Sequence, residues 1–351
     1  MSKFWSEATK RCVPYVPGEQ LNRTNIIKLN TNENPYPPSP KVIKAIIEET
    51  DRNLNLYPSP TADKLKEEIA AFHHLSKANI FVGNGSDEIL AFAFMAFFDS
   101  NRKIKYPAIS YSFYPVYAKL FNIQSEQVPL NADFTIPVED FFNSEGGVIF
   151  PNPNAPTGIY LEIESVKEIL EHNSDQVVIV DEAYIDFASE SAVSLINSYE
   201  NLLVIQTMSK SRSLAGLRVG FALGQPDLIE GLGRIKDSFN SYTVDRLAIN
   251  GAEAAIKDVD YFNDTRNRII QTREWTIAEM NKRGFSVLPS QTNFIFATHP
   301  EQEASQLYSS LKEKGILVRH FQKKPIEDYI RITIGTDEQM QTFFKTLDVI
   351  I

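Results

Sequence analysis

The sequence predicts an α/β protein in which helices cover a large, mostly parallel mixed sheet, followed by a smaller α+β domain. Short apolar runs alternate with helical patterns from about residue 80 to residue 205, as in parallel sheets that are buried on both faces. The pattern changes after about residue 245, and the 351 residues exceed the usual size of one hydrophobic core.

The first part of the chain is expected to be an arm. Proline and asparagine are frequent in residues 1–40, which favours an extended segment rather than a packed element. Helices are expected over residues 41–50 and 62–75, and Thr61 is placed to cap the second of them. The first domain is therefore expected to begin near residue 41.

The remaining elements follow from periodicity. The large sheet is expected to take strands from residues 80–82, 148–150, 177–180, 202–205 and 219–223, with helices over 87–98 and 165–171. A long amphipathic helix is expected from residue 246 through the 270s. The smaller domain is then completed by strands at 294–296, 316–318 and 329–334 and helices at 304–314 and 337–347.

Composition restricts the class of protein. A net charge of −10 argues against a nucleic-acid partner. A single cysteine, Cys12, allows no internal disulfide framework, which is typical of a reducing compartment. The first residues lack the apolar core of a signal peptide, and the longest apolar stretch is about half a membrane span. We therefore expect a cytoplasmic protein with no membrane partner and no metal.

Lys210 is the most informative residue. It lies between two apolar runs, 202–205 and 219–223, where desolvating an ammonium group is costly. A lysine in such a place suits Schiff-base chemistry with a carbonyl compound. A lone lysine would more often be a surface residue of a loop, so the interpretation depends on the neighbouring loops.

Two of these loops offer places for an anion. Gly83 to Glu88 follows a strand and opens a helix, and the free N–H groups at a helix start favour an anion. Ser209 and Arg218 flank Lys210 and have groups that bind phosphate. The alternatives are a plain turn capped by Ser86 or Asp87 and an ordinary surface arginine.

Two further loops carry polar side chains at strand ends. Asn154 lies in a loop that three prolines stiffen, and Asp181 directly follows a buried strand, where a carboxylate needs a cationic partner. The alternatives are a rigid structural loop and a helix cap or ion pair. One cofactor explains all four loops: pyridoxal phosphate has an aldehyde for Lys210, a phosphate for the anion sites and a ring nitrogen for Asp181.

The order of these motifs resembles a known family. G-S-D-E, N-P-N-A-P-T-G, V-D-E-A-Y and S-K-x4-A-G-L-R-x-G are similar to the fold-type I pyridoxal-phosphate aminotransferases. Four further segments make the chain resemble the histidinol-phosphate aminotransferases in particular: 14–18, 29–36, 57–58 and 329–335. The resemblance covers residues 14 to 335.

The resemblance implies roles around the cofactor ring. Lys210 would form an imine with the aldehyde and later move the substrate proton, and Asp181 would keep the ring nitrogen protonated. Tyr184 and Asn154 would hydrogen-bond the 3-oxygen of the ring. Tyr111 would lie against the ring face, although aromatic core packing would also explain a tyrosine there.

It also implies how the cofactor phosphate is held. The backbone N–H groups of Ser86 and Asp87 would bind it together with Ser209 and Arg218. Tyr57 would reach the same phosphate from a neighbouring subunit. The expected assembly is therefore a homodimer with shared active sites.

Arg331 is the expected substrate residue. Alternation in 330–334 puts its isoleucines on one face and Arg331 on the other, away from the core. A solvated strand arginine is the alternative. The resemblance implies that Arg331 and Arg319 bind the substrate phosphate, with Tyr15 and Asn34 nearby.

The expected organisation has three regions. Residues 1–40 form an arm that joins the small domain and contacts a partner subunit, residues 41–245 form the cofactor-binding domain, and residues 246–351 form the small domain. Two positions depart from the family pattern. Ala155 stands where many relatives have a second asparagine, and Ser59 stands where they often have aspartate.

The expected reaction is transamination. Histidinol phosphate and 2-oxoglutarate would give imidazole-acetol phosphate and glutamate. The alternatives are an aromatic amino-acid aminotransferase, a threonine-phosphate decarboxylase, and a protein that binds pyridoxal phosphate without turnover.

Overall fold

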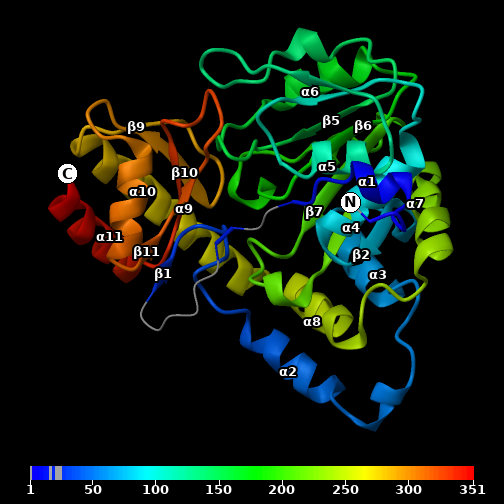
Figure 1. Cartoon of the computed structure of the whole chain (residues 1–351). Coiled ribbons are helices and arrows are strands. Elements are labelled where there is room, and N and C mark those ends of the chain that lie inside the picture. Colours follow the sequence, from blue (N-terminus) through cyan, green and yellow to red (C-terminus); the bar gives the residue numbers. More distant parts are fainter. Residues whose placement is uncertain (1, 16–17, 20–25) are drawn as a thin grey trace.

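A seven-stranded sheet forms the centre of the larger half in the computed structural model, which describes residues 2–15, 18–19 and 26–351 (Figure 1). Its strand order is β2-β8-β7-β6-β5-β3-β4. The strands are β2 (Ile80–Gly83), β3 (Ile104–Pro107), β4 (Ser125–Val128), β5 (Val148–Pro151), β6 (Val178–Asp181), β7 (Leu202–Thr207) and β8 (Gly220–Gly224). Only β8 runs antiparallel to its neighbours, so the prediction of a mostly parallel mixed sheet is confirmed.

The helices of the larger half pack on the two faces of this sheet or on one another. They are α1 (Glu7–Arg11), α2 (Pro40–Glu49), α3 (Asp63–Phe72), α4 (Gly85–Phe97), α5 (Tyr114–Leu120), α6 (Ile163–Glu171), α7 (Pro226–Phe239) and α8 (Arg246–Lys257). Successive residues of a strand point to opposite faces, so Val178 and Val180 pack into one core while Ile179 packs into the other. None of the described helices is long and apolar enough to cross a membrane.

The smaller half, yellow to red in Figure 1 apart from its blue strand near the N-terminus, contains two sheets. The first has the order β12-β13-β10-β9, and β1 pairs with β11 in the second. Its elements are β1 (Ile27–Lys28), β9 (Ser286–Val287), β10 (Phe294–Thr298), β11 (Ile316–Leu317), β12 (Arg319–His320), β13 (Ile330–Thr333), α9 (Val259–Lys282), α10 (Ala304–Glu313) and α11 (Asp337–Ile350). Single turns of 3-10 helix lie at Arg52–Asn55, Lys77–Asn79, Val138–Phe141, Ile185–Phe187, Ala192–Leu195 and Ala215–Leu217.

The N-terminal arm is more structured than predicted. It contains α1, in which Arg11 donates hydrogen bonds to the carbonyls of Lys119 and Leu120 at the end of α5. It also contains β1, which pairs in parallel with β11, Ile27 opposite Ile316. The domain boundaries at residues 40 and 245 stay predictions.

The predicted long helix after residue 246 is wrong, because the chain breaks at Asp258 into α8 and α9. The Asp258 carboxylate accepts hydrogen bonds from the Ser39 hydroxyl and from Lys41 Nζ, the latter at 2.7 Å. These contacts with the start of α2 hold Asp258 out of helical geometry, with ψ at 66°. Thr61 does not cap α3, because its hydroxyl binds the Asp63 side chain.

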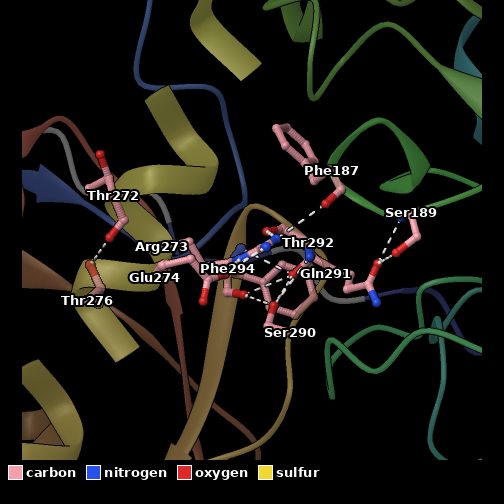
Figure 2. A network of polar contacts seen from close by, with 10 residues as sticks. All are labelled: Phe187, Ser189, Thr272, Arg273, Glu274, Thr276, Ser290, Gln291, Thr292 and Phe294. Carbon is pink, nitrogen blue, oxygen red and sulfur yellow. Dashed lines mark hydrogen bonds and ion pairs between the residues drawn. The ribbon is translucent and has the colours of Figure 1, made fainter. Parts of the chain in front are cut away.

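A network of polar contacts joins the two halves (Figure 2). Arg273 of α9 donates to the carbonyl of Thr292 at 3.0 Å and to that of Phe187 at 3.4 Å. The Gln291 side-chain oxygen accepts from the backbone and hydroxyl of Ser189, each at 2.9 Å. The segment that leads into β10 is thereby tied to the larger half. This holds the small sheet close to the carboxyl ends of the parallel strands.

Candidate active site

A cavity of about 270 Å³ lies where the carboxyl ends of the parallel strands face the small sheet. Six predicted site residues line it: Tyr15, Tyr111, Tyr184, Lys210, Arg319 and Arg331. Other lining residues were given no role from the sequence: Asn30, Thr31, Asn32, Ala155, Pro156 and Phe321. The cavity is thus built from both halves and from the arm.

Lys210 follows β7 and points into this cavity. Its Nζ donates to the carbonyl of Thr31 at 3.4 Å and lies 5.7 Å from the centre of the Tyr184 ring. Asn34 holds the backbone beside it by donating to the carbonyls of Lys210 at 2.8 Å and Ser211 at 3.1 Å. The amide nitrogen of Asn34 is thus used by the backbone that carries the lysine, and the predicted contact of Asn34 with substrate stays a prediction.

Asp181 ends β6 and is only 4% exposed. Burial raises the pKa of its carboxyl group to about 6, although hydrogen bonds from the Tyr114 hydroxyl at 2.8 Å and the Ala183 N–H at 3.2 Å favour the ionised form. Tyr114 was missed in the sequence. The available signal was its place in the same aromatic segment as Tyr111, whose ring lies 5.9 Å from that of Tyr114.

The start of α4 lies against Arg218. The first turn of α4, the start of β8 and Arg218 come close because two positions are glycine: a Cβ on Gly85 would lie 2.6 Å from Arg218 Nη2, and one on Gly220 would lie 2.5 Å from the Ser86 nitrogen. Arg218 pairs with the Asp87 carboxylate at 3.1 Å. The structure therefore brings three predicted phosphate residues together at a helix start, where N–H groups lack intrahelical partners.

Tyr111 and Ser209 are held by neighbouring polar side chains. The Tyr111 hydroxyl donates to Asp87 at 2.6 Å, and burial together with this carboxylate raises the pKa of the tyrosine far above its usual value. Ser209 is buried, and its hydroxyl accepts a hydrogen bond from Thr207 at 3.0 Å. Their proposed contacts with a cofactor stay predictions.

Asn154 is buried beside the cavity. Its amide nitrogen donates to the carbonyl of Ile109 at 3.0 Å, and its oxygen has no partner among the described residues. The next two residues of the loop, Ala155 and Pro156, line the cavity instead. Asn154 therefore uses its amide nitrogen for a bond within the protein, and its contact with a cofactor stays a prediction.

Two arginines lie side by side on neighbouring strands of the small sheet. Arg319 of β12 stands opposite Arg331 of β13 in an antiparallel register. Like charges at such positions repel each other unless an anion lies between them. Burial and the charge of Arg319 lower the pKa of Arg331, whose Nη2 donates to the carbonyl of Asn30 at 2.9 Å. Its buried Nε has no partner among the described residues.

Tyr57 lies outside the cavity of its own chain. It is 78% exposed and stacks on Tyr242 with 4.5 Å between the ring centres. Ser59, the second departure from the family pattern, accepts a hydrogen bond from the Ala62 N–H at 3.0 Å and so fixes the turn before α3. Tyr15 stacks on Phe113 at 4.5 Å and closes one side of the cavity.

Comparisons with known proteins agree with this geometry. Residues 24–347 match the family described as "Aminotransferase class I and II". A histidinol-phosphate aminotransferase of Oceanobacillus iheyensis is 63% identical over all of this chain and 99% of its own length, and one of Clostridium acetobutylicum is 55% identical over 99% of each. A crystal structure of the Sinorhizobium meliloti histidinol-phosphate aminotransferase with pyridoxal-5'-phosphate superposes with a TM-score of 0.90, at 24% identity over 100% of this chain and 98% of that one.

The raised pKa of Asp181 predicts a pH-dependent stability. The raised pKa contributes to the free energy of unfolding. This contribution is fully present below the unfolded pKa of about 4 and is lost as the pH rises through about 6. Cofactor-free Asp181→Asn should therefore be more stable than the wild type by about 3 kcal/mol at pH 8 and nearly equal to it at pH 4. Thermal unfolding at both values, with the exposed Asp175→Asn as control, tests this. A difference independent of pH would contradict it.

Proposed function

The chain belongs to the class I and II aminotransferase family, and on that premise we propose that it transfers the amino group of histidinol phosphate to 2-oxoglutarate. The products are imidazole-acetol phosphate and glutamate, a step of histidine biosynthesis. The cofactor is pyridoxal phosphate. The observation that carries the proposal is that one cavity contains both an amine at a strand end, Lys210, and a facing pair of arginines, Arg319 and Arg331.

The residues present fit this cofactor. The glycine positions at 85 and 220 leave room at the start of α4, where the N–H groups of Ser86 and Asp87 and the guanidinium of Arg218 suit a phosphate. Asp181 is a buried carboxylate with no cation bound to it among the described residues, and a ring N–H would supply one. When bound, pyridoxal phosphate supplies an aldehyde for the amino group and a ring that withdraws electrons.

The side chains divide the proton handling between them. Asp181 would hold a proton on the ring nitrogen, and the hydrogen bond from Tyr114 would help the carboxylate to stay ionised for that purpose. Lys210 Nζ, in the cavity wall, would take the proton from the substrate Cα and give it to C4′ of the cofactor. Tyr184 would hydrogen-bond the 3-oxygen, and Tyr111 would cover one face of the ring.

The arginine pair selects a phosphorylated substrate. Two guanidinium groups on opposite strands carry two positive charges, which match a phosphate dianion and can bind it in bidentate geometry. The unpartnered Arg331 Nε is a buried donor that such an anion would satisfy. An aromatic amino acid would offer the pair only a carboxylate. Threonine phosphate would offer a phosphate, but the decarboxylase reaction would release carbon dioxide instead of transferring the amino group.

We propose a homodimer with shared active sites. Exposed apolar side chains gather on and after α2, the helix at the bottom of Figure 1: Ile43, Ile47, Leu54, Leu56 and Tyr57. Such a surface is unfavourable in water unless a second subunit covers it. The single cysteine supports a cytoplasmic location.

Replacing Lys210 tests the function. Lys210→Ala should lower transamination between histidinol phosphate and 2-oxoglutarate by at least about 10³-fold, because both the cofactor attachment and the proton carrier are lost. Borohydride reduction of the loaded wild type should place the cofactor mass on the peptide that contains Lys210. Lys282→Ala, at an exposed position near the end of α9, is the control. Substantial remaining activity would refute the mechanism.

Replacing Arg319 tests the substrate class. Arg319→Met should reduce kcat/KM for histidinol phosphate about 10- to 100-fold, the usual loss for one charged hydrogen-bonded contact, and should affect phenylalanine much less. The comparison is made by single-turnover absorbance with each amino donor, and Arg102→Met, at an exposed position, is the matched control. Equal losses for both donors would favour an aromatic amino-acid aminotransferase. Carbon dioxide released from threonine phosphate would favour the decarboxylase.

Charging α2 tests the assembly. Ile47→Asp should convert the dimer to monomers in sedimentation experiments, because a carboxylate would be buried without a partner. Weaker retention of the cofactor should follow, since Tyr57 of the partner subunit would be lost from the site. Val349→Asp, an exposed apolar position on α11, should leave the dimer intact. A monomeric wild type would contradict the proposal.

A further inference from the structure

Three consecutive residues of the arm contact three different groups of the site. The carbonyl of Asn30 accepts from Arg331 at 2.9 Å, and that of Thr31 accepts from Lys210 at 3.4 Å. The side chain of Asn32 donates to the Tyr184 hydroxyl at 2.9 Å. The sequence drew attention to this segment as part of a family motif without giving it a role.

Asn32 is buried at 1% exposure and is held from several sides. Its backbone N–H donates to the Thr333 hydroxyl at 3.0 Å, and its carbonyl accepts from Asn293 at 3.0 Å. Its φ of 55° lies in the left-handed region, which asparagine adopts more readily than most residues. The side chain therefore has one place to go, between the strand that carries Arg331 and the ring of Tyr184.

The hydrogen bonds fix which way the Asn32 amide points. The Thr333 hydroxyl already accepts the Asn32 N–H, so its own proton needs an acceptor, and among the described residues this is Asn32 Oδ1 at 2.9 Å. The amide nitrogen is then left to face Tyr184. With the amide reversed, the buried threonine proton would have no acceptor there.

The orientation determines the role of Tyr184. Because the tyrosine oxygen accepts a hydrogen bond from Asn32, its own proton is free for a group inside the cavity that Tyr184 lines. We infer that Asn32 is a positioning residue that keeps Tyr184 a hydrogen-bond donor to the 3-oxygen of the cofactor. The inference rests on the proposed function, since it requires pyridoxal phosphate in this cavity.

Asn32→Asp tests this with little change in shape. A carboxylate at this position accepts the tyrosine proton, so Tyr184 no longer donates to the cofactor. In the wild type, the hydrogen bond from Tyr184 stabilises negative charge on the 3-oxygen and so lowers the pH at which the bound cofactor loses its proton. In protein loaded with pyridoxal phosphate, the pH midpoint of the visible absorbance change should therefore rise by about 1 to 2 units in the variant.

A double-mutant cycle separates positioning from general damage. Tyr184→Phe alone should raise the midpoint to a similar extent, and adding Asn32→Asp to it should raise it no further. Asn293→Ala removes a bond to the same backbone without touching Tyr184, so it should lower the melting temperature and leave the midpoint unchanged. A purely structural role of Asn32 would instead give additive shifts in the double variant.

The outcomes are distinguishable from failure of the proposed function. Wild-type protein that takes up no pyridoxal phosphate would overturn the function itself. Uptake by Asn32→Asp with an unchanged midpoint would overturn only the role of Asn32. If that variant does not fold, Thr333→Val replaces it, because losing the hydroxyl frees the Asn32 amide; the midpoint should then rise by a smaller amount, and no rise would overturn the inference.

Discussion

The site depends on burying charged groups without giving each a full set of protein partners. Asp181 is held at the end of β6 by a tyrosine hydroxyl and one backbone N–H, and no described cation pairs with it. Arg331 is held through one carbonyl and keeps an unpartnered Nε. Desolvation of this kind is costly, and a bound cofactor and an anionic substrate would relieve it.

The two halves are joined where the site is made. Arg273 and Gln291 tie the segment before β10 to the larger half (Figure 2). Residues 30–32 of the arm then run between the halves and contact Arg331, Lys210 and Tyr184 in turn. A change in the position of the small sheet would therefore alter both the arginine pair and the groups around the cofactor.

Much of the site was predictable because polar residues at the ends of apolar strands are conspicuous. Lys210 and Asp181 each follow a run whose residues are all buried. The residues that were missed lack this contrast. Tyr114 looks like one more aromatic residue of a helix, and Asn32 becomes informative only through partners at residues 184 and 333. The motif that contains Asn34 likewise does not show that its amide binds the backbone of Lys210.

The sequence by itself determined the class of fold and the types of chemical group available, because apolar periodicity sets strands and helices and a parallel sheet brings strand ends to one edge. Only the tertiary structure decided which groups meet. The break at Asp258, the opposition of Arg319 and Arg331, and the hydrogen bond from Asn32 to Tyr184 all join residues from different elements, most of them far apart in the chain. Such contacts depend on how elements pack in three dimensions, which local patterns along the chain do not specify.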